Sequence, residues 1–117
     1  MVLIIGASTK EDRYSFMATE RLLGAGFEVY LLAKRKGEVL GQKINNVMPK
    51  TGSIDTVTMY VGASHQEEYL ISLLELAPRR VIFNPGTENI ELQELLISKG
   101  IEVEVNCTLV MLSLKHF

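Results

Sequence analysis

The sequence contains a single cysteine and no long apolar run. Cys107 stands alone among 117 residues, which excludes an intramolecular disulfide and a cysteine-rich zinc site. A membrane helix needs roughly 20 apolar residues in a row. No run in this chain approaches that length, and the apolar residues 1–6 are too few for a signal peptide. We therefore expect a protein of the reducing cytoplasm with no membrane partner.

Neither sign of charge dominates the chain. It has 12 Lys and Arg against 14 Asp and Glu, a formal net charge of −2, so it lacks the positive excess that favours nucleic acid as a partner. Its length and its hydrophobic content of 47% suit one core that needs no disulfide or structural metal. We expect residues 1–117 to form a single domain.

Five short runs of apolar or β-branched residues predict the strands of a parallel sheet. Helical patterns separate most of these runs, and right-handed crossovers between parallel strands then build an α/β, Rossmann-like, doubly wound sheet with helices on both faces. We expect about five strands in the order 3-2-1-4-5, with the ligand crevice at the carboxyl ends of the first and fourth strands. The predicted strands are residues 2–5, 27–32, 54–61, 81–83 and 101–105, the last of which alternates and so suits an edge.

The helices have recognisable starts and stops. One apolar face runs through residues 14–25 and stops at Gly26, and Ser64 and Glu67 have the spacing of a capping box that would start a second helix. That helix should end at Pro78, and a third is marked by leucines within residues 92–96.

Two further segments carry weaker patterns. Residues 34–53 include four glycines or prolines and are predicted to be a loop with little regular structure. Residues 108–114 are apolar enough to form a helix that packs on the core, covers the sheet edge or contacts a partner subunit. A homodimer is therefore possible.

The loop after the first predicted strand is small, polar and directly followed by a helix. Backbone N–H groups at a helix N-terminus attract phosphate, and small residues let a diphosphate approach the chain. An ordinary tight turn with solvated polar residues is the alternative interpretation. The residues that carry this prediction are Gly6, Ala7, Ser8, Thr9, Arg13 and Ser15.

The dinucleotide fingerprint G-x-G-x-x-G is absent, because Ser8 and Glu11 replace its second and third glycines. The acid that binds ribose in NAD sites is also missing after the second strand, where Lys34, Arg35 and Lys36 follow one another. Three cations suit a phosphorylated ribose, either the 3′-phosphate of coenzyme A or the 2′-phosphate of NADP. A solvated basic loop is the alternative.

The loops after the third and fourth predicted strands contain further residues that could line the ligand crevice. Val61 and Gly62 begin a stretch that can lie close to a flat group, and residues 84–89 contain a rigid Pro-Gly turn at the expected crevice. Without a ligand, Ser64 would only cap its helix and residues 84–89 would be an ordinary turn. No histidine stands near Cys107 in the sequence, and we find no catalytic set, so the sequence gives no reason to assign a reaction.

Taken together, five stretches resemble the small stand-alone coenzyme A-binding proteins, which are related to the coenzyme A-binding domain of the succinyl-CoA synthetase α subunit. The stretches are residues 2–8 with 13–15, then 26–30, 37–41, 84–89 and 105–109, and the similarity spans nearly the whole chain. In that family the first glycine loop and the loops after the second, third and fourth strands embrace the coenzyme. The resemblance therefore implies contacts from Gly6 to Ser15, Tyr14 included, and from Lys34, Val61, Gly62, Asn84, Pro85 and Gly86.

The chain departs from the family pattern in two loops. Residues 32–34 replace the usual Val-Asn-Pro, and residues 61–63 replace a frequent Arg-Pro, so contacts from those motifs do not transfer. Three functions stay open: a module that binds coenzyme A or an acyl-CoA, an NADP-dependent enzyme or sensor, and a degenerate Rossmann-like protein that acts through protein contacts. In the first two the partner is a small nucleotide-like ligand.

Overall fold

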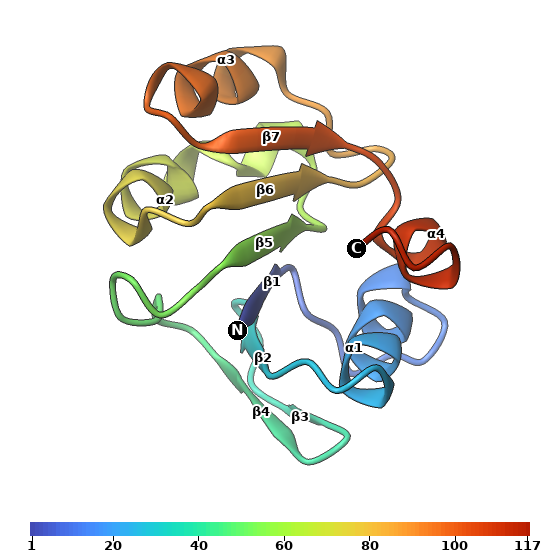
Figure 1. Cartoon of the computed structure of the whole chain (residues 1–117). Helices are drawn as coiled ribbons and strands as arrows, with labels where there is room; N and C mark the ends of the chain where they lie inside the picture. The colour runs from blue at the N-terminus through green and yellow to red at the C-terminus, as the bar shows by residue number, and fades with distance from the viewer.

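A computed structural model describes residues 1–117 as a seven-stranded sheet with helices on both faces (Figure 1). The strand order is β3-β4-β2-β1-β5-β6-β7, and all neighbours are parallel except β3 and β4. The strands are β1 Val2–Ile5, β2 Val29–Leu32, β3 Glu38–Val39, β4 Gln42–Asn45, β5 Thr56–Met59, β6 Arg80–Phe83 and β7 Glu102–Val105. The helices are α1 Tyr14–Gly24, α2 Leu70–Leu76, α3 Ile90–Ser98 and α4 Thr108–Ser113, with short 3₁₀ turns η1 Ala63–His65 and η2 Glu67–Tyr69.

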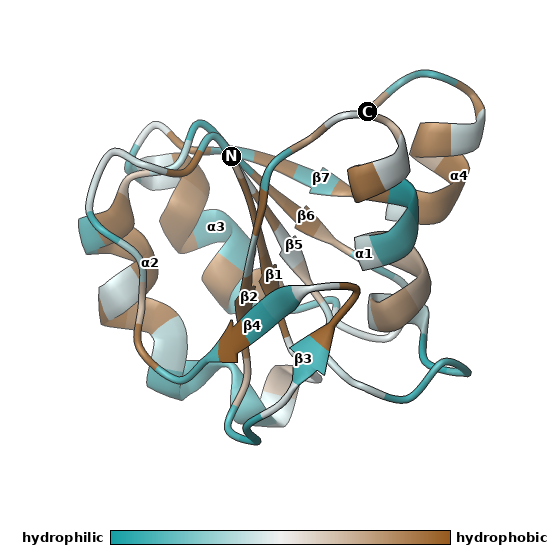
Figure 2. Cartoon of the chain, turned by 90° about the horizontal axis from the view of Figure 1, so that it is seen from below, coloured by the Kyte–Doolittle hydropathy of each residue, from teal (hydrophilic) through white to brown (hydrophobic).

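Two apolar layers cover the sheet, one on each face (Figure 2). Because side chains alternate along a strand, Leu3 and Ile5 of β1 join the layer under α2 and α3, whereas Val2 and Ile4 join the layer under α1. All four are buried, which is why β1 reads as a continuous apolar run. The predicted Rossmann-like α/β class is therefore confirmed.

The predicted strand count and order are wrong in detail. Residues 34–53 are not a plain loop, because they contain the hairpin of β3 and β4, and β4 extends the sheet beyond β2. Among the five strands that were predicted, the order is 2-1-3-4-5. The order of the parallel strands becomes 3-2-1-4-5-6 once β4 is counted as the third. The switch point therefore lies between β1 and β5, not between β1 and β6.

The capping box predicted at Ser64 does not form. The chain makes two 3₁₀ turns there, no side-chain cap is present, and α2 begins only at Leu70. It ends at Leu76, where Ala77 adopts a left-handed φ of 51° just before Pro78. The side chain that caps a helix is Asn89, whose Oδ1 accepts a hydrogen bond from the Leu92 N–H of α3 at 3.2 Å.

Helix α4 packs most of its apolar residues against the core, while Val110 is exposed. Leu109 and Met111 are buried, and Leu112 and Phe117 pack against the layer under α1. β7 is one of the two edge strands of the sheet, as predicted, and none of its residues is fully buried. No helix combines the length and the apolar character needed to cross a membrane.

Candidate functional site

A cavity of about 410 Å³ opens where the carboxyl ends of β1 and β5 diverge. Four loops supply its lining, because the carboxyl ends of parallel strands meet at one edge of the sheet. They are the loop from β1 into α1, the loop after β2, and those after β5 and β6. The lining residues are Gly6, Ser8, Lys10, Arg13, Tyr14, Ser15, Arg35, Tyr60, Gly62, Pro85, Gly86 and Thr87.

The charge of this cavity is of one sign. Lys10, Arg13 and Arg35 line it, and no aspartate or glutamate does. None of the three cations takes part in an ion pair, although acids outnumber bases in the chain. Three unpaired cations around a polar hollow favour an anionic ligand.

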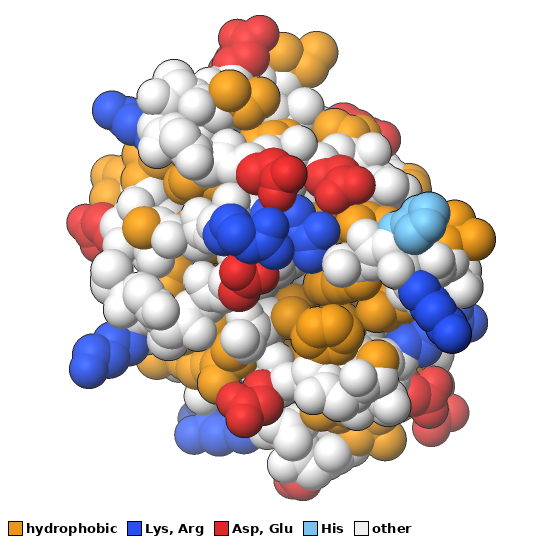
Figure 3. Space-filling view, in the orientation of Figure 1, with side chains coloured by type: hydrophobic (Ala, Val, Ile, Leu, Met, Phe, Trp, Pro, Cys, Tyr) orange, Lys and Arg blue, Asp and Glu red, His pale blue; other side chains and the backbone are white.

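Three of the nine basic side chains outside the cavity, Lys34, Arg79 and Arg80, form ion pairs with acidic side chains. The face drawn in Figure 3 shows a central group of basic side chains with acidic ones close beside it. The ion pairs of the molecule show the same pattern: Arg79 lies 2.8 Å from Asp55 and 3.3 Å from Glu102, and Arg80 lies 3.5 Å from Glu104. The cavity gathers three unpaired cations from two loops, with no carboxylate among its lining residues.

The N-terminus of α1 adds two free backbone donors. The amides of Tyr14 and Ser15 have no acceptor within the chain, and Arg13 provides no side-chain cap. By contrast, the amides of Gly6 and Ala7 both donate to the carbonyl of Leu32, at 2.9 and 3.2 Å. The amides at the helix end are thus available to an anion, whereas those of Gly6 and Ala7 are not.

Gly6 brings the end of β1 close to the end of β5. Its φ is +94°, a conformation that favours glycine, and a Cβ at this position would lie 3.0 Å from the backbone C and O of Tyr60. This close approach shapes the floor of the cavity.

The family of the chain follows from its sequence as a whole. Residues 1–113 match the family described as CoA binding domain. The chain belongs to that family. No curated protein matches the chain.

Solved structures agree with this assignment in fold. An uncharacterised protein has 47% sequence identity, with a TM-score of 0.96, and the alignment covers 99% of this chain and 96% of that one. A hypothetical protein from Pyrococcus horikoshii has 24% identity and a TM-score of 0.86, over 97% of this chain and 81% of its own. A Thermus thermophilus protein has 19% identity and a TM-score of 0.87, over 99% and 89%.

Eight of the thirteen residues that the sequence singled out line the cavity of this CoA-binding domain. They are Gly6, Ser8, Arg13, Tyr14, Ser15, Gly62, Pro85 and Gly86. The other five lie elsewhere. Ala7 is buried in the core, Thr9 lies against Gly37, Val61 packs against the layer under α2 and α3, Lys34 faces Glu68, and Asn84 is enclosed.

Lys34 is engaged at a second pocket. Its Nζ lies 3.0 Å from Glu68 Oε1, and the hydrogen bond to that carboxylate raises the pKa of Lys34. The pocket has a volume of about 450 Å³ and lies between the ends of β2 and β4 and the start of α2. Arg35, the next residue, turns to the cation-lined cavity instead.

Asn84 has a structural position in this CoA-binding domain. Its Nδ2 donates to Thr58 Oγ1 at 2.7 Å and to the Met59 carbonyl at 2.9 Å, and its Oδ1 accepts from the Thr108 N–H at 2.8 Å. Only 2% of the residue is exposed. Asn84 therefore fixes the loop after β6 to β5 and to the start of α4.

Four lining residues were not named individually as contacts from the sequence: Lys10, Arg35, Tyr60 and Thr87. Lys10 and Arg35 stood in segments already singled out, but nothing in the sequence separates the cation that faces a cavity from its neighbours. Tyr60 falls at the end of a predicted strand. Its enclosed hydroxyl makes no hydrogen bond of good geometry, and burial raises the pKa of Tyr60 to about 12, an effect that the nearby Thr108 and Thr58 hydroxyls only partly offset.

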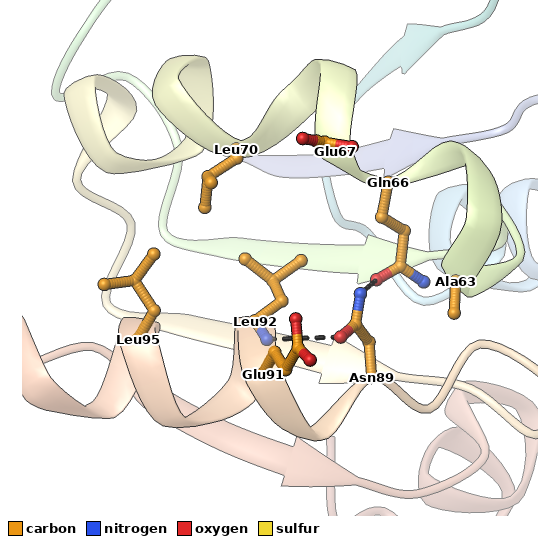
Figure 4. A pocket seen from close by; sticks show the side chains of 8 residues that line it. All are labelled: Ala63, Gln66, Glu67, Leu70, Asn89, Glu91, Leu92 and Leu95. Atoms are coloured by element: carbon orange, nitrogen blue, oxygen red, sulfur yellow. Dashed lines mark hydrogen bonds between the residues drawn. The ribbon is translucent and has the colours of Figure 1, made fainter.

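A separate pocket of about 330 Å³, with both apolar and polar lining residues, lies between α2 and α3 (Figure 4). Leu70, Leu92 and Leu95 converge inside it, with Glu67 and Glu91 at its sides. It has no cation and is not suited to phosphate. No group of three or more His, Cys, Asp or Glu side chains in the molecule could hold a metal ion.

Proposed function

We propose that this protein binds coenzyme A or an acyl-CoA, with the diphosphate in the cation-lined cavity. The observation that carries the proposal is the combination of three unpaired cations, no carboxylate, and two free amides at the N-terminus of α1. Such a set satisfies phosphate oxygens by both charge and hydrogen bonding. Membership of the CoA-binding family supports the same ligand.

The loop after β2 suits the 3′-phosphate and the adenine. Arg35 faces the diphosphate cavity and Lys34 faces the neighbouring pocket, so a phosphorylated ribose at this loop would lie within reach of both. That pocket is lined largely by apolar side chains, Leu32, Ala33, Val47, Met48 and Tyr69, as a flat base requires. Within the basic run, Arg35 faces the cavity without an acidic partner, whereas Lys34 is paired with Glu68.

The proposed function is binding, without an assigned reaction. Phosphate-binding groups, and no nucleophile–base pair, surround the cavity. NADP also carries a diphosphate and a ribose phosphate, so it is the competing ligand. A protein that has lost ligand binding would retain the fold and respond to neither.

Thermal unfolding with three ligands, coenzyme A, dephospho-coenzyme A and NADP, tests the proposal. Coenzyme A at about 100 times its dissociation constant should stabilise the fold by roughly 2.7 kcal/mol, which raises the melting temperature on the order of 10 °C. Dephospho-coenzyme A should give a smaller shift at equal concentration, because it lacks the 3′-phosphate. A larger shift with NADP than with coenzyme A would overturn the ligand assignment, and no shift with either would indicate a degenerate site.

A further inference from the structure

Gln66 is a fully buried polar side chain that joins two loops of the site. It lies between η1 and η2, and 0% of its surface is exposed. Its Nε2 donates to the Val61 carbonyl at 2.8 Å and to the Thr87 carbonyl at 2.7 Å. Its Oε1 accepts a hydrogen bond from Asn89 Nδ2 at 3.1 Å (Figure 4). Both amide hydrogens and the oxygen of this side chain are thus used.

The hydrogen bonds of Gln66 connect the two chain segments beyond the point where the backbone pairing of β5 and β6 ends. The pairing of β5 with β6 stops at Met59 and Phe83, and no backbone hydrogen bond joins residues 61–66 to residues 85–89. Among side chains, only Gln66 bridges these two segments. The same segments supply Gly62 and Pro85–Thr87 to the cation-lined cavity. Gln66 itself does not line that cavity, so any effect on a ligand there acts through the two loops.

We propose that Gln66 is a positioning residue of the coenzyme A site, whose three hydrogen bonds hold the loops after β5 and β6 at the separation that the diphosphate requires. The inference rests on the proposed function. A buried amide is costly unless all its groups are paired. Here the hydrogen bonds of Gln66 hold the two loops in a fixed arrangement before the ligand binds. Less conformational entropy is then lost on binding.

The substitution Gln66→Glu tests this role because it changes hydrogen bonding with little change of shape. An ionised carboxylate would face the carbonyl oxygens of Val61 and Thr87 and repel them. Once protonated, the acid can donate to one carbonyl and still accept from Asn89. Burial and the carboxylates of Glu67 and Glu91, which line the same pocket, should raise the pKa of the introduced group.

The quantity to measure is the ratio of the coenzyme A dissociation constants of the variant and the wild type, well below both melting temperatures. We expect a ratio of roughly tenfold or more at about pH 8.5, falling toward one at about pH 5.5. Titration of the ligand phosphates affects both proteins, so the ratio removes it. Loss of stability alone would not give a ratio that recovers on protonation.

Gln93→Glu is the matched control. The Gln93 side chain accepts from the Asn89 N–H at 2.9 Å through Oε1, an interaction that a carboxylate retains, so its ratio should stay near one at both pH values. A ratio of one for Gln66→Glu at both pH values, with a wild type that binds, overturns the role of Gln66 alone. A folded wild type that does not bind coenzyme A overturns the proposed function and this inference together. If Gln66→Glu is unfolded at the higher pH, Gln66→Met should weaken binding at both, and unchanged affinity contradicts the role.

Discussion

Arg13 and Arg35 come from different loops and reach the same cavity without an acidic partner. Their side chains are exposed, so folding does not depend on their charge. A guanidinium that neither pairs within the protein nor packs in the core is available for a phosphate oxygen. Their contribution should therefore appear in binding and not in stability.

Replacing either arginine by glutamine tests this contribution. Arg13→Gln and Arg35→Gln should each weaken coenzyme A binding about tenfold, because each removes a charge-assisted hydrogen bond. Isothermal titration calorimetry measures the effect. Arg21→Gln is the control, since Arg21 lies on the last turn of α1 and does not line the cavity. If all three variants bind coenzyme A with the affinity of the wild type, Arg13 and Arg35 do not contact the ligand.

Gly6 and Gly26 offer a matched pair for the backbone. Both have a positive φ, +94° and +90°, but only at Gly6 would a Cβ meet other atoms. Gly26→Ala should cost roughly 1–2 kcal/mol for the left-handed conformation. Gly6→Ala should cost on the order of 1 kcal/mol more, because the Cβ also presses on the Tyr60 backbone. Urea unfolding measures both, and equal losses would show that the close approach to β5 is unimportant.

At the scale of elements, the strands that the sequence revealed are those buried on both faces. β1, β5 and β6 are entirely buried, so apolar or β-branched runs mark them. The hairpin of β3 and β4 left no such signal, because only Val39 and Ile44 of its residues are buried. The sequence also did not predict the turn between β3 and β4. Both central residues of that turn, Leu40 and Gly41, have positive φ, and leucine is unusual at the first of these positions. Because β4 was not predicted, the third strand of the sheet was assigned wrongly, and the crevice was expected between β1 and β6 when the switch point lies between β1 and β5.

The same observation predicts a stabilising substitution. Leu40 adopts a φ of 50° and is 52% exposed, so its side chain gains little from burial. Leu40→Asn should raise the free energy of unfolding by about 0.5–1 kcal/mol, since asparagine tolerates the left-handed region better than leucine does. Leu40→Ala removes the same side chain without that preference and should not stabilise. A lower stability for the asparagine variant would contradict the turn geometry.

At the scale of the site, the loops could be predicted from the sequence but the side chains only in part. Loops that follow parallel strands must gather at one edge of the sheet, so the residues around Gly6 and Pro85 could be placed together. Which member of a basic run faces the cavity depends on its neighbours in space. Glu68, 34 residues beyond Lys34 in the chain, holds that lysine at another pocket, and no local pattern records this ion pair.

At the scale of the whole molecule, the ion-pair cluster of Asp55, Arg79 and Glu102 and the candidate site lie at opposite ends of the parallel strands. Asp55 precedes β5, Arg79 precedes β6 and Glu102 begins β7, so their cluster lies at the amino ends of the strands. Hydrogen bonds from Arg79 and Thr56 hold the pKa of the Asp55 carboxyl at about 2, below its usual 3.8. The carboxylate is about half exposed, which keeps its contribution to stability small and sensitive to salt.

Because the folded state depresses the pKa of Asp55, its stabilising contribution is complete above the unfolded pKa and is lost as pH falls toward 2. The wild type should therefore be more stable than Asp55→Asn near neutral pH, and the difference should close between about pH 5 and pH 2 and shrink in about 1 M salt. Urea unfolding across this range measures the difference, and Asp12→Asn, whose carboxylate forms no ion pair, should show no comparable trend.

Since distant sites act independently, Asp55→Asn should leave coenzyme A affinity at neutral pH unchanged. A weaker affinity in that variant would mean that the two edges of the sheet are coupled and that the cation-lined cavity is not a self-contained site.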